Sequence, residues 1–220
     1  MTTEFVPVGH EGAQVEVSER PSWYAGTGAA LGVIAAAVIA IGLGAVCIVL
    51  AVTAALPVLV VPATILLVAA LVGLSMIVVL APGHTFVVQL FGRYVGTVRQ
   101  SGLGLVPPLT TRRRVSARVR NFETAELKVN DAVGNPVHVA AIIVWQVADT
   151  AKATFGVQDY EEFIGTQAES ALRQVTTAHP YDDDAGHGTT SLRGSTDEVA
   201  AELAEQVADR ASPAGLEIIE

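Results

Sequence analysis

The chain has 220 residues, 22 of them acidic and 13 basic, so its net charge is −9, yet its mean hydropathy is +0.48. An acidic chain is a poor binder of nucleic acid, and we expect no nucleic-acid partner. The single cysteine, Cys47, excludes a scaffold of disulfide bonds. From residue 21 to residue 92 there is no Asp, Glu, Lys or Arg, and an uncharged run of that length is too long for the core helix of a soluble domain.

The uncharged run has room for two membrane segments. As one helix, its strongly apolar part would be about 80 Å long, against about 30 Å of hydrocarbon in a bilayer. Pro57 and Pro62 lie near its middle and interrupt helices, so we expect a turn near residues 55–62, between segments over 29–54 and 63–81. Two crossings and a shallow re-entrant hairpin have the same hydropathy, and both topologies stay open.

Basic residues predict on which side of the membrane the two ends lie. None lies between the segments, Arg20 precedes them, and seven arginines follow within residues 81–120. The positive-inside rule therefore places both ends on the cytoplasmic side of the cell membrane. A cleaved signal peptide fits poorly, because the charged residues before the run are mainly acidic and the run is too long.

The residues after the apolar run first follow the pattern of strands. We expect two short strands within 84–98, a half-buried strand with a basic outer face over 114–119, and a pair over 124–129 and 136–147. The last segment is apolar on both faces, which predicts a central strand covered on each side.

A helical pattern takes over further along the chain. Apolar residues recur at helical spacing over 159–179, Asp149 is expected to cap a shorter helix, and Ser195 opens a capping-box sequence before a third helix. Residues 215–220 read as a closing strand. Strands followed by helices predict an α+β fold.

Several segments of this part occur in the order of a known family. They are residues 89–94, 102–108, 129–137, 143–147 and 168–173. Their order and spacing resemble the SPFH family (stomatin, prohibitin, flotillin and HflK-HflC, also called band 7) of membrane-anchored scaffold proteins, over about residues 81–220.

The resemblance implies a cytoplasmic α+β domain, an antiparallel sheet with packed helices, that assembles into large homo-oligomers. Such assemblies organise lipids and proteins around them or restrain membrane proteases and channels. We expect a polar tail over 1–26, a hydrophobic anchor over 27–82 and the SPFH domain over 83–220. The chain stops within an expected strand and lacks the family's long C-terminal coiled-coil helix, so we expect it to be shortened there.

Charge indicates one candidate contact with the membrane. Residues 81–120 hold seven arginines and no acid, whereas residues 121–220 hold five basic and 18 acidic residues. Arginines that closely follow a membrane segment meet the anionic inner leaflet, where each contributes about 1 kcal/mol. Arg112, Arg113 and Arg114 are therefore candidate ligands of lipid headgroups. Alternatively, these arginines only form the solvent-exposed face of a strand and contribute to the positive-inside signal.

An uncharged, proline-rich loop is a second candidate, because in the resembled family this loop can dip into the inner leaflet. Its residues are Leu105, Val106, Pro107, Pro108 and Leu109. A rigid loop packed on the domain is the alternative.

Catalytic and metal-binding motifs are missing from the sequence. It has no nucleophile at triad spacing, no Gly-rich phosphate loop and no Cys/His ligand set, so we expect no enzyme activity, no metal and no cofactor. His179, His187 and aspartates 182–184 form an acidic stretch, but Pro180 and nearby glycines indicate a loop without fixed ligand geometry. The alternative function is an accessory subunit of a membrane protease complex or of a transporter, although the apolar segments hold no ionisable pathway residue.

Overall fold

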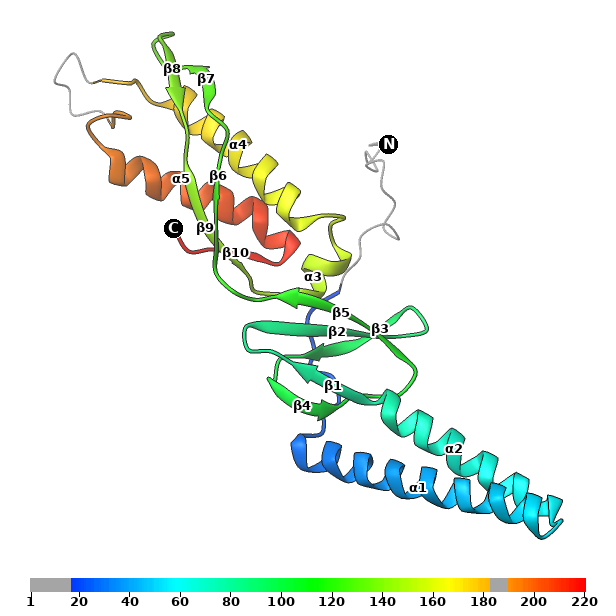
Figure 1. Cartoon of the computed structure of the whole chain (residues 1–220). Helices are drawn as coiled ribbons and strands as arrows, with labels where there is room; N and C mark the ends of the chain where they lie inside the picture. The colour runs from blue at the N-terminus through cyan, green and yellow to red at the C-terminus, as the bar shows by residue number, and fades with distance from the viewer. Residues whose placement is uncertain (1–16, 183–189) are drawn as a thin grey trace, which may run out of the picture. The chain divides into compact units, whose positions relative to one another are not determined.

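The structure, a computed structural model, describes residues 17–182 and 190–220 (Figure 1). It contains two compact units. Residues 20–116 form the N-terminal unit, and the described residues 117–182 and 190–220 form the C-terminal unit together with residues 17–19. Both units combine helices with antiparallel strand pairs, so the expected α+β fold is confirmed.

The N-terminal unit begins with two apolar helices that pack side by side. Its elements are α1 (Thr27–Thr53), the one-turn helix η2 (Pro57–Leu59), α2 (Val60–Ser75), β1 (Ile77–Leu80), β2 (His84–Leu90), β3 (Arg93–Val98), β4 (Gly102–Leu105) and β5 (Thr110–Ser116). α1, and α2 taken with η2, are each long and apolar enough to cross a membrane. Two membrane-capable helices with a turn at the prolines match the sequence expectation.

The expected second segment, 63–81, is wrong at its C-terminal end. α2 stops at Ser75, and Ile77–Leu80 form β1, which pairs antiparallel with β4. Hydropathy did not separate the two because β1 is as apolar as the helix before it. Its β-branched residues favour a strand once a partner strand is available.

The contact between α1 and α2 is built from small residues at every seventh position. The buried residues are Ala30, Ala37, Gly44 and Ala51 on α1, and Ala63 and Ala70 on α2. A Cβ atom added to Gly44 would lie 3.4 Å from the side chain of Leu67. Small side chains let the helix backbones approach closely, which is how helices associate in lipid.

Strands of the N-terminal unit form a three-stranded sheet, β3-β2-β5, and the pair β1-β4. Five buried residues of this unit, Val78, Leu80, Val88, Val98 and Val106, form one hydrophobic cluster, with Tyr24 and Phe86 packed against it. The expected strand over 114–119 is wrong in extent, because β5 covers Thr110–Ser116 and Val119 is exposed.

The C-terminal unit packs three helices with two small antiparallel sheets. Its elements are β6 (Arg120–Glu123), β7 (Leu127–Asn130), β8 (Pro136–Val139), β9 (Ile142–Val147), α3 (Thr150–Phe155), α4 (Tyr160–Ala178), α5 (Thr196–Ala211), the one-turn helix η3 (Ser212–Ala214) and β10 (Leu216–Ile218). β9 is central in the sheet β10-β9-β6, and β7 pairs with β8.

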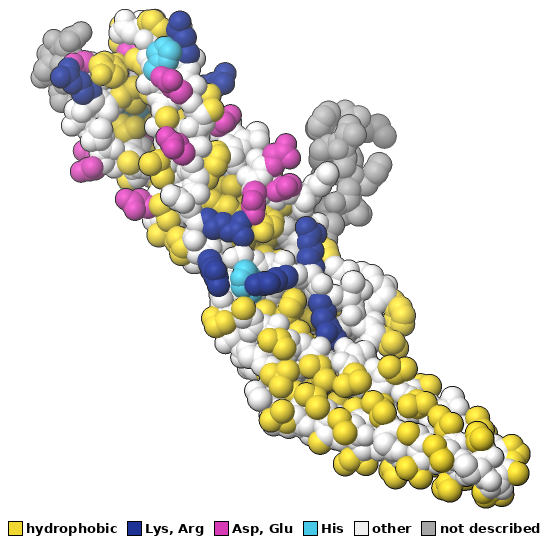
Figure 2. Space-filling view, viewed as in Figure 1, with side chains coloured by type: hydrophobic (Ala, Val, Ile, Leu, Met, Phe, Trp, Pro, Cys, Tyr) yellow, Lys and Arg dark blue, Asp and Glu magenta, His cyan; other side chains and the backbone are white. Residues whose placement is uncertain are grey.

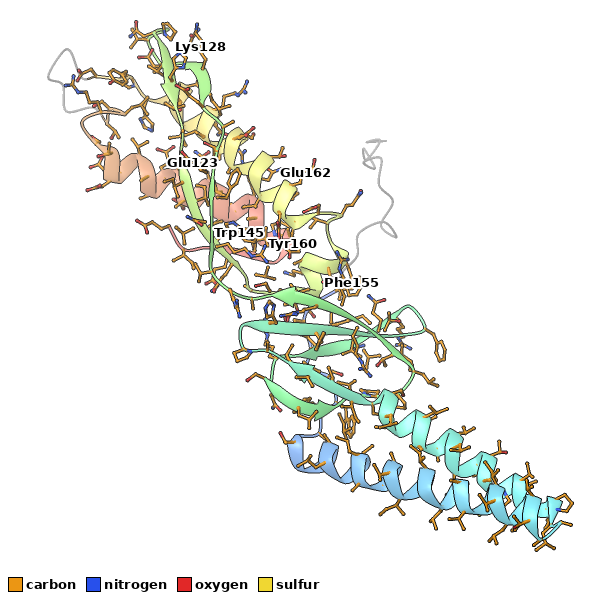
Figure 3. All side chains as sticks on the ribbon, in the orientation of Figure 1. Glu123, Lys128, Trp145, Phe155, Tyr160 and Glu162 are labelled. Carbon is orange, nitrogen blue, oxygen red and sulfur yellow. The ribbon has the colours of Figure 1, made fainter. Side chains whose placement is uncertain are left out.

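One face of β9 forms part of the core. Ile143, Trp145 and Val147 are buried, and the Trp145 ring meets the Tyr160 ring of α4 edge-on, with centroids 6.1 Å apart (Figure 3). The expectation of cover on both faces is wrong at Ile142, whose side chain is 63% exposed. The expected single strand over 136–147 is also interrupted, at residues 140–141.

Helix starts in this unit follow the sequence expectations in part. The expected Asp149 cap is confirmed, because its carboxylate accepts N–H groups of the first turn of α3. Asp159 caps α4 in the same way, although the sequence expectations did not include that cap. Ser195 lies at the N-cap of α5, but its side chain makes no capping hydrogen bond, so the expected capping box is wrong. A cap that the sequence did not indicate is Glu19, whose carboxylate accepts the N–H and hydroxyl of Thr150.

Asp131 holds the turn between β7 and β8. Its carboxylate accepts backbone N–H groups of Val133, Asn135 and Tyr181 and the side-chain amide of Asn135. Desolvation by burial acts to raise the pKa of Asp131, but these hydrogen bonds outweigh it and hold the pKa below its ordinary value. The charged carboxylate therefore ties this turn to the chain after α4.

Candidate membrane-proximal site

The segment before α1 is hydrogen-bonded to strands that follow α2. The Ser22 N–H donates to the Thr97 carbonyl at 3.0 Å, and the Thr97 N–H donates to the Arg20 carbonyl at 2.8 Å. Ala25 and Leu105 exchange two bonds, of 3.1 and 2.8 Å. Residues on both sides of the apolar helix pair thus share one folded layer.

Two glycines make room for this N-terminal segment. A Cβ atom on Gly96 would lie 2.7 Å from the backbone N and Cα of Ser22, and one on Gly104 would lie 2.3 Å from the Tyr24 ring. The Arg20 guanidinium also stacks over the Tyr94 ring, with 5.5 Å between Cζ and the ring centroid. The segment is therefore closely packed against β3 and β4.

Arg112 caps the C-terminal end of α2. Its guanidinium donates to the carbonyls of Ser75 and Ile77, the latter at 3.0 Å. Desolvation by burial lowers the pKa of Arg112 from its usual value, although an arginine stays protonated at physiological pH. A cation at a helix C-terminus is favourable, because the last carbonyls carry partial negative charge. Arg112 thus joins β5 to the end of a membrane-capable helix.

The three candidate arginines do not share one face. Side chains alternate along a strand, so Arg112 and Arg114 project from one face of β5 and Arg113 from the other. Arg112 lies opposite Val88, a core residue, and Arg113 lies opposite Val87. Arg113 and Arg114 are exposed, whereas Arg112 is half-buried. Contact with lipid headgroups therefore stays a proposal for Arg113 and Arg114.

The proline-rich loop is mostly part of the domain. Leu105 and Val106 are buried, and Pro107 and Pro108 are half-buried. Leu109 is 67% exposed, so within this loop only its side chain is largely available to lipid. Insertion of this loop into the inner leaflet therefore stays a proposal for the side chain of Leu109.

Phe91 is an exposed apolar residue that sequence reasoning missed. It lies in the turn between β2 and β3 and is 86% exposed. Leu90 pairs with Thr110, so Phe91 and Leu109 both flank the same end of the sheet. Figure 2 shows that the viewed face of α1 and α2 is covered by hydrophobic side chains and carries no charged one. The sequence did contain one indication that Phe91 is exposed, because this aromatic residue directly precedes Gly92 at the expected hairpin turn.

Two residues of the acidic stretch near residue 180 bond to side chains elsewhere in the fold. His179 bonds Glu202 at 2.7 Å, and Asp182 bonds Arg193 at 2.9 Å. Within residues 17–182 and 190–220, no three His, Cys, Asp or Glu side chains gather as metal ligands do. Residues 183–187 of the stretch lie outside the described residues.

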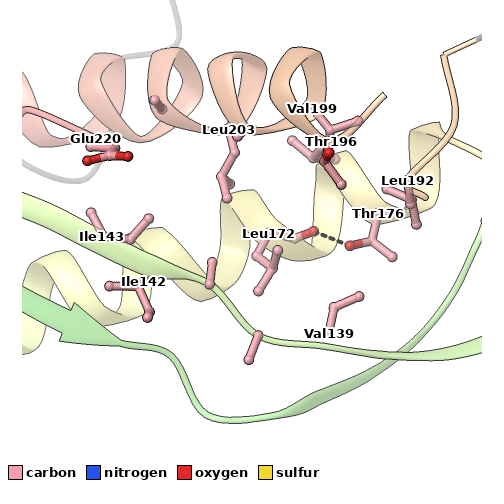
Figure 4. A pocket seen from close by; sticks show the side chains of 15 residues that line it. Val139, Ile142, Ile143, Leu172, Thr176, Leu192, Thr196, Val199, Leu203 and Glu220 are labelled. Carbon is pink, nitrogen blue, oxygen red and sulfur yellow. Dashed lines mark hydrogen bonds between the residues drawn. The ribbon is translucent and has the colours of Figure 1, made fainter. Parts of the chain in front are cut away.

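A cavity of about 420 Å³ lies in the C-terminal unit (Figure 4). Residues 139–143 form one wall, and helices α4 and α5 form the others. Leu172, Val175 and Leu203 make its lining apolar, and Glu220 lies at one end. The sequence did not indicate this cavity, because its walls come from segments that are far apart in the chain.

Comparison with known families gives one match. The model described as "SPFH domain / Band 7 family" matches residues 78–220, which is well over half of the chain. The matched region begins within β1 and includes the C-terminal unit from residue 117 onward. No curated protein matches the chain with significance.

Proposed function

Because the chain belongs to the SPFH domain / Band 7 family, we propose that it is a membrane-anchored scaffold. It combines that domain with two N-terminal helices that are long and apolar enough to cross a membrane. The family is generally non-enzymatic. In the proposed role, copies of the chain assemble at the cytoplasmic face and organise the lipids and proteins around them.

One observation carries the anchoring part of the proposal. Residues 20–25, before the helix pair, hydrogen-bond to β3 and β4, after it. This contact supports a hairpin anchor whose two ends lie on the same side of the bilayer. The arginines that follow the pair favour the cytoplasmic side.

A labelling experiment tests this topology. Cys47 is changed to Ala, and single cysteines replace the exposed residues Ser18 or Glu205. In sealed vesicles, a membrane-impermeant maleimide should label both positions from the same side and neither from the other. Labelling of the two positions from opposite sides would overturn the hairpin anchor.

Lipid contact is the second part of the proposal. Arg113 and Arg114 are exposed on β5, and an anionic leaflet attracts arginines close to its surface, so these two side chains are the proposed headgroup contacts. Full-length protein carrying Arg113→Glu and Arg114→Glu should retain fewer phosphatidylglycerol molecules in native mass spectrometry than the wild type. Equal retention contradicts the lipid role.

Assembly is the third part, with membrane proteases or channels as the partner classes. Native mass spectrometry or electron microscopy of the full-length protein in detergent measures it directly. Homo-oligomers are expected. A strict monomer across the accessible concentration range would defeat the scaffold proposal.

A further inference from the structure

We propose that the N-terminal unit inserts the side chains of Phe91 and Leu109 among the lipid acyl chains of the leaflet in which α2 ends. These two residues and Leu90 form the apolar tip of the sheet β3-β2-β5. The inference adds Phe91, which the sequence expectations did not include, and names acyl chains as its ligand. It rests on the proposed membrane anchor, and its test is separate from the tests of topology and assembly.

The apolar tip is exposed on the surface of the unit. Phe91 is 86% exposed, Leu109 67% and Leu90 37%. Leu90 pairs with Thr110 across β2 and β5, so Phe91, which follows Leu90, and Leu109, which precedes Thr110, lie at the same end of the sheet. Single exposed apolar residues are ordinary, whereas several together mark a surface that binds a membrane or a protein.

The backbone at both tip residues is strained. Phe91 has φ +48° and Leu109 has φ +58°, in the left-handed region that bulky residues rarely adopt and that costs them free energy. Among the described residues other than glycine, only Ala55, in the turn after α1, shares a positive φ. Side chains as exposed as those of Phe91 and Leu109 recover little of this cost by packing within the fold. Burial among acyl chains would offset it, because apolar surface leaves water.

The apolar tip lies close to the end of a membrane-capable helix. Together, η2 and α2 are 19 residues long, about 28 Å against about 30 Å of hydrocarbon, so a crossing helix would have Ser75 at the hydrocarbon edge. The Arg112 guanidinium donates to the Ser75 carbonyl. Arg112 lies opposite Val88, and Leu90 is two residues further, about 7 Å along β2. Figure 1 shows the turn between β2 and β3 and the start of β5 on the side of the sheet where α2 ends.

Charge favours a lipid leaflet over a protein as the partner of the tip. Residues 20–116 contain no Asp or Glu. Arg93 is exposed directly after the turn that carries Phe91, and Arg113 and Arg114 are exposed on the strand that follows Leu109. Apolar side chains bordered by cations alone complement a leaflet in which anionic headgroups cover acyl chains.

Fluorescence quenching in vesicles measures how deep the tip lies. In full-length protein with Cys47→Ala, Phe91→Cys and Leu109→Cys are labelled singly with the environment-sensitive dye NBD. The vesicles contain phosphatidylcholine, phosphatidylglycerol and lipids that carry a nitroxide quencher either on the acyl chain or on the headgroup. Ser101→Cys is the matched control, because Ser101 is exposed and precedes Gly102, which pairs with Leu80 at the end of β1 further from α2.

Dye at residues 91 and 109 should lose more fluorescence to the acyl-chain nitroxide than to the headgroup nitroxide, and dye at residue 101 should lose little to either. Stronger quenching by the headgroup nitroxide at residue 91, or quenching there no greater than at residue 101, would overturn the inference. Blue-shifted emission at residue 91 without quenching would also overturn it, because the dye would then contact protein. The oligomeric state is measured on the same samples. A monomer with an inserted tip defeats the scaffold alone, and an oligomer whose tip stays outside the acyl chains defeats this inference alone.

Discussion

Replacing Gly104 with Ala tests the packing of the N-terminal segment on β4. The added Cβ atom would lie 2.3 Å from the Tyr24 ring, whereas nonbonded carbons rest about 3.5–4.0 Å apart, so the ring must move by more than about 1 Å. If Tyr24 stays in place, overpacking costs about 1–3 kcal/mol. If the segment detaches, the two hydrogen bonds between Ala25 and Leu105 are lost, at about 1 kcal/mol each. The chain takes the less costly route, so we expect destabilisation of about 2 kcal/mol.

Hydrogen exchange in detergent measures this change at the bonds concerned. The amides of Ala25 and Leu105 should exchange about thirtyfold faster in Gly104→Ala, because exchange reports the free energy of local opening. Gly28→Ala is the control, since a Cβ atom there meets nothing within 4 Å. Combining Gly104→Ala with Tyr24→Ala removes the clash and should restore part of the protection. Unchanged exchange in Gly104→Ala would refute the packing and, with it, the argument that both chain segments lie on one side of the membrane.

Three further predictions concern the helix pair, the end of α2 and the turn held by Asp131. Gly44→Leu should widen the distance between spin labels on α1 and α2 by about 1–2 Å, because an added Cβ atom already meets α2 at 3.4 Å. Gly42→Leu should leave this distance unchanged, because a Cβ atom on Gly42 meets nothing within 4 Å. An equal increase of the distance in both variants would contradict the contact through small residues. Arg112→Gln removes charged donors from the carbonyl of Ser75, at the end of α2, and of Ile77, at the start of β1. It should raise amide exchange in the last turn of α2 about tenfold, whereas Arg113→Gln should leave that exchange unchanged. The lowered pKa of Asp131 means that its carboxylate contributes full stability above about pH 4 and loses that contribution as the pH falls through its folded pKa. Asp131→Asn should therefore unfold at a lower temperature at pH 7 and show a smaller loss between about pH 4 and 2. Equal acid sensitivity of both proteins in thermal unfolding would contradict this role.

Local patterns predicted the elements whose stability depends on their own residues. The apolar run with its prolines predicted two helices and a turn, and the spacing over 159–179 predicted α4 within a residue or two at each end. Asp149 and Asp159 cap α3 and α4 because a carboxylate satisfies N–H groups within its own turn. These interactions span only a few positions, so a single sequence contains them.

Partners from distant parts of the chain decided the rest. Ile77–Leu80 became a strand because Gly102–Leu105 lies beside it, although hydropathy alone favoured a longer helix. Arg112 became a helix cap because β5 passes close to the end of α2.

The sequence by itself determined that this chain has two apolar helices, a family-specific α+β domain and an excess of arginine just after the apolar helices. The tertiary structure alone decided which of those arginines stay exposed and that the segment before α1 packs on β3 and β4. Composition and periodicity indicate whether each residue prefers solvent, lipid or the protein core. Pairing between residues tens of positions apart depends on chain topology, which no local pattern records.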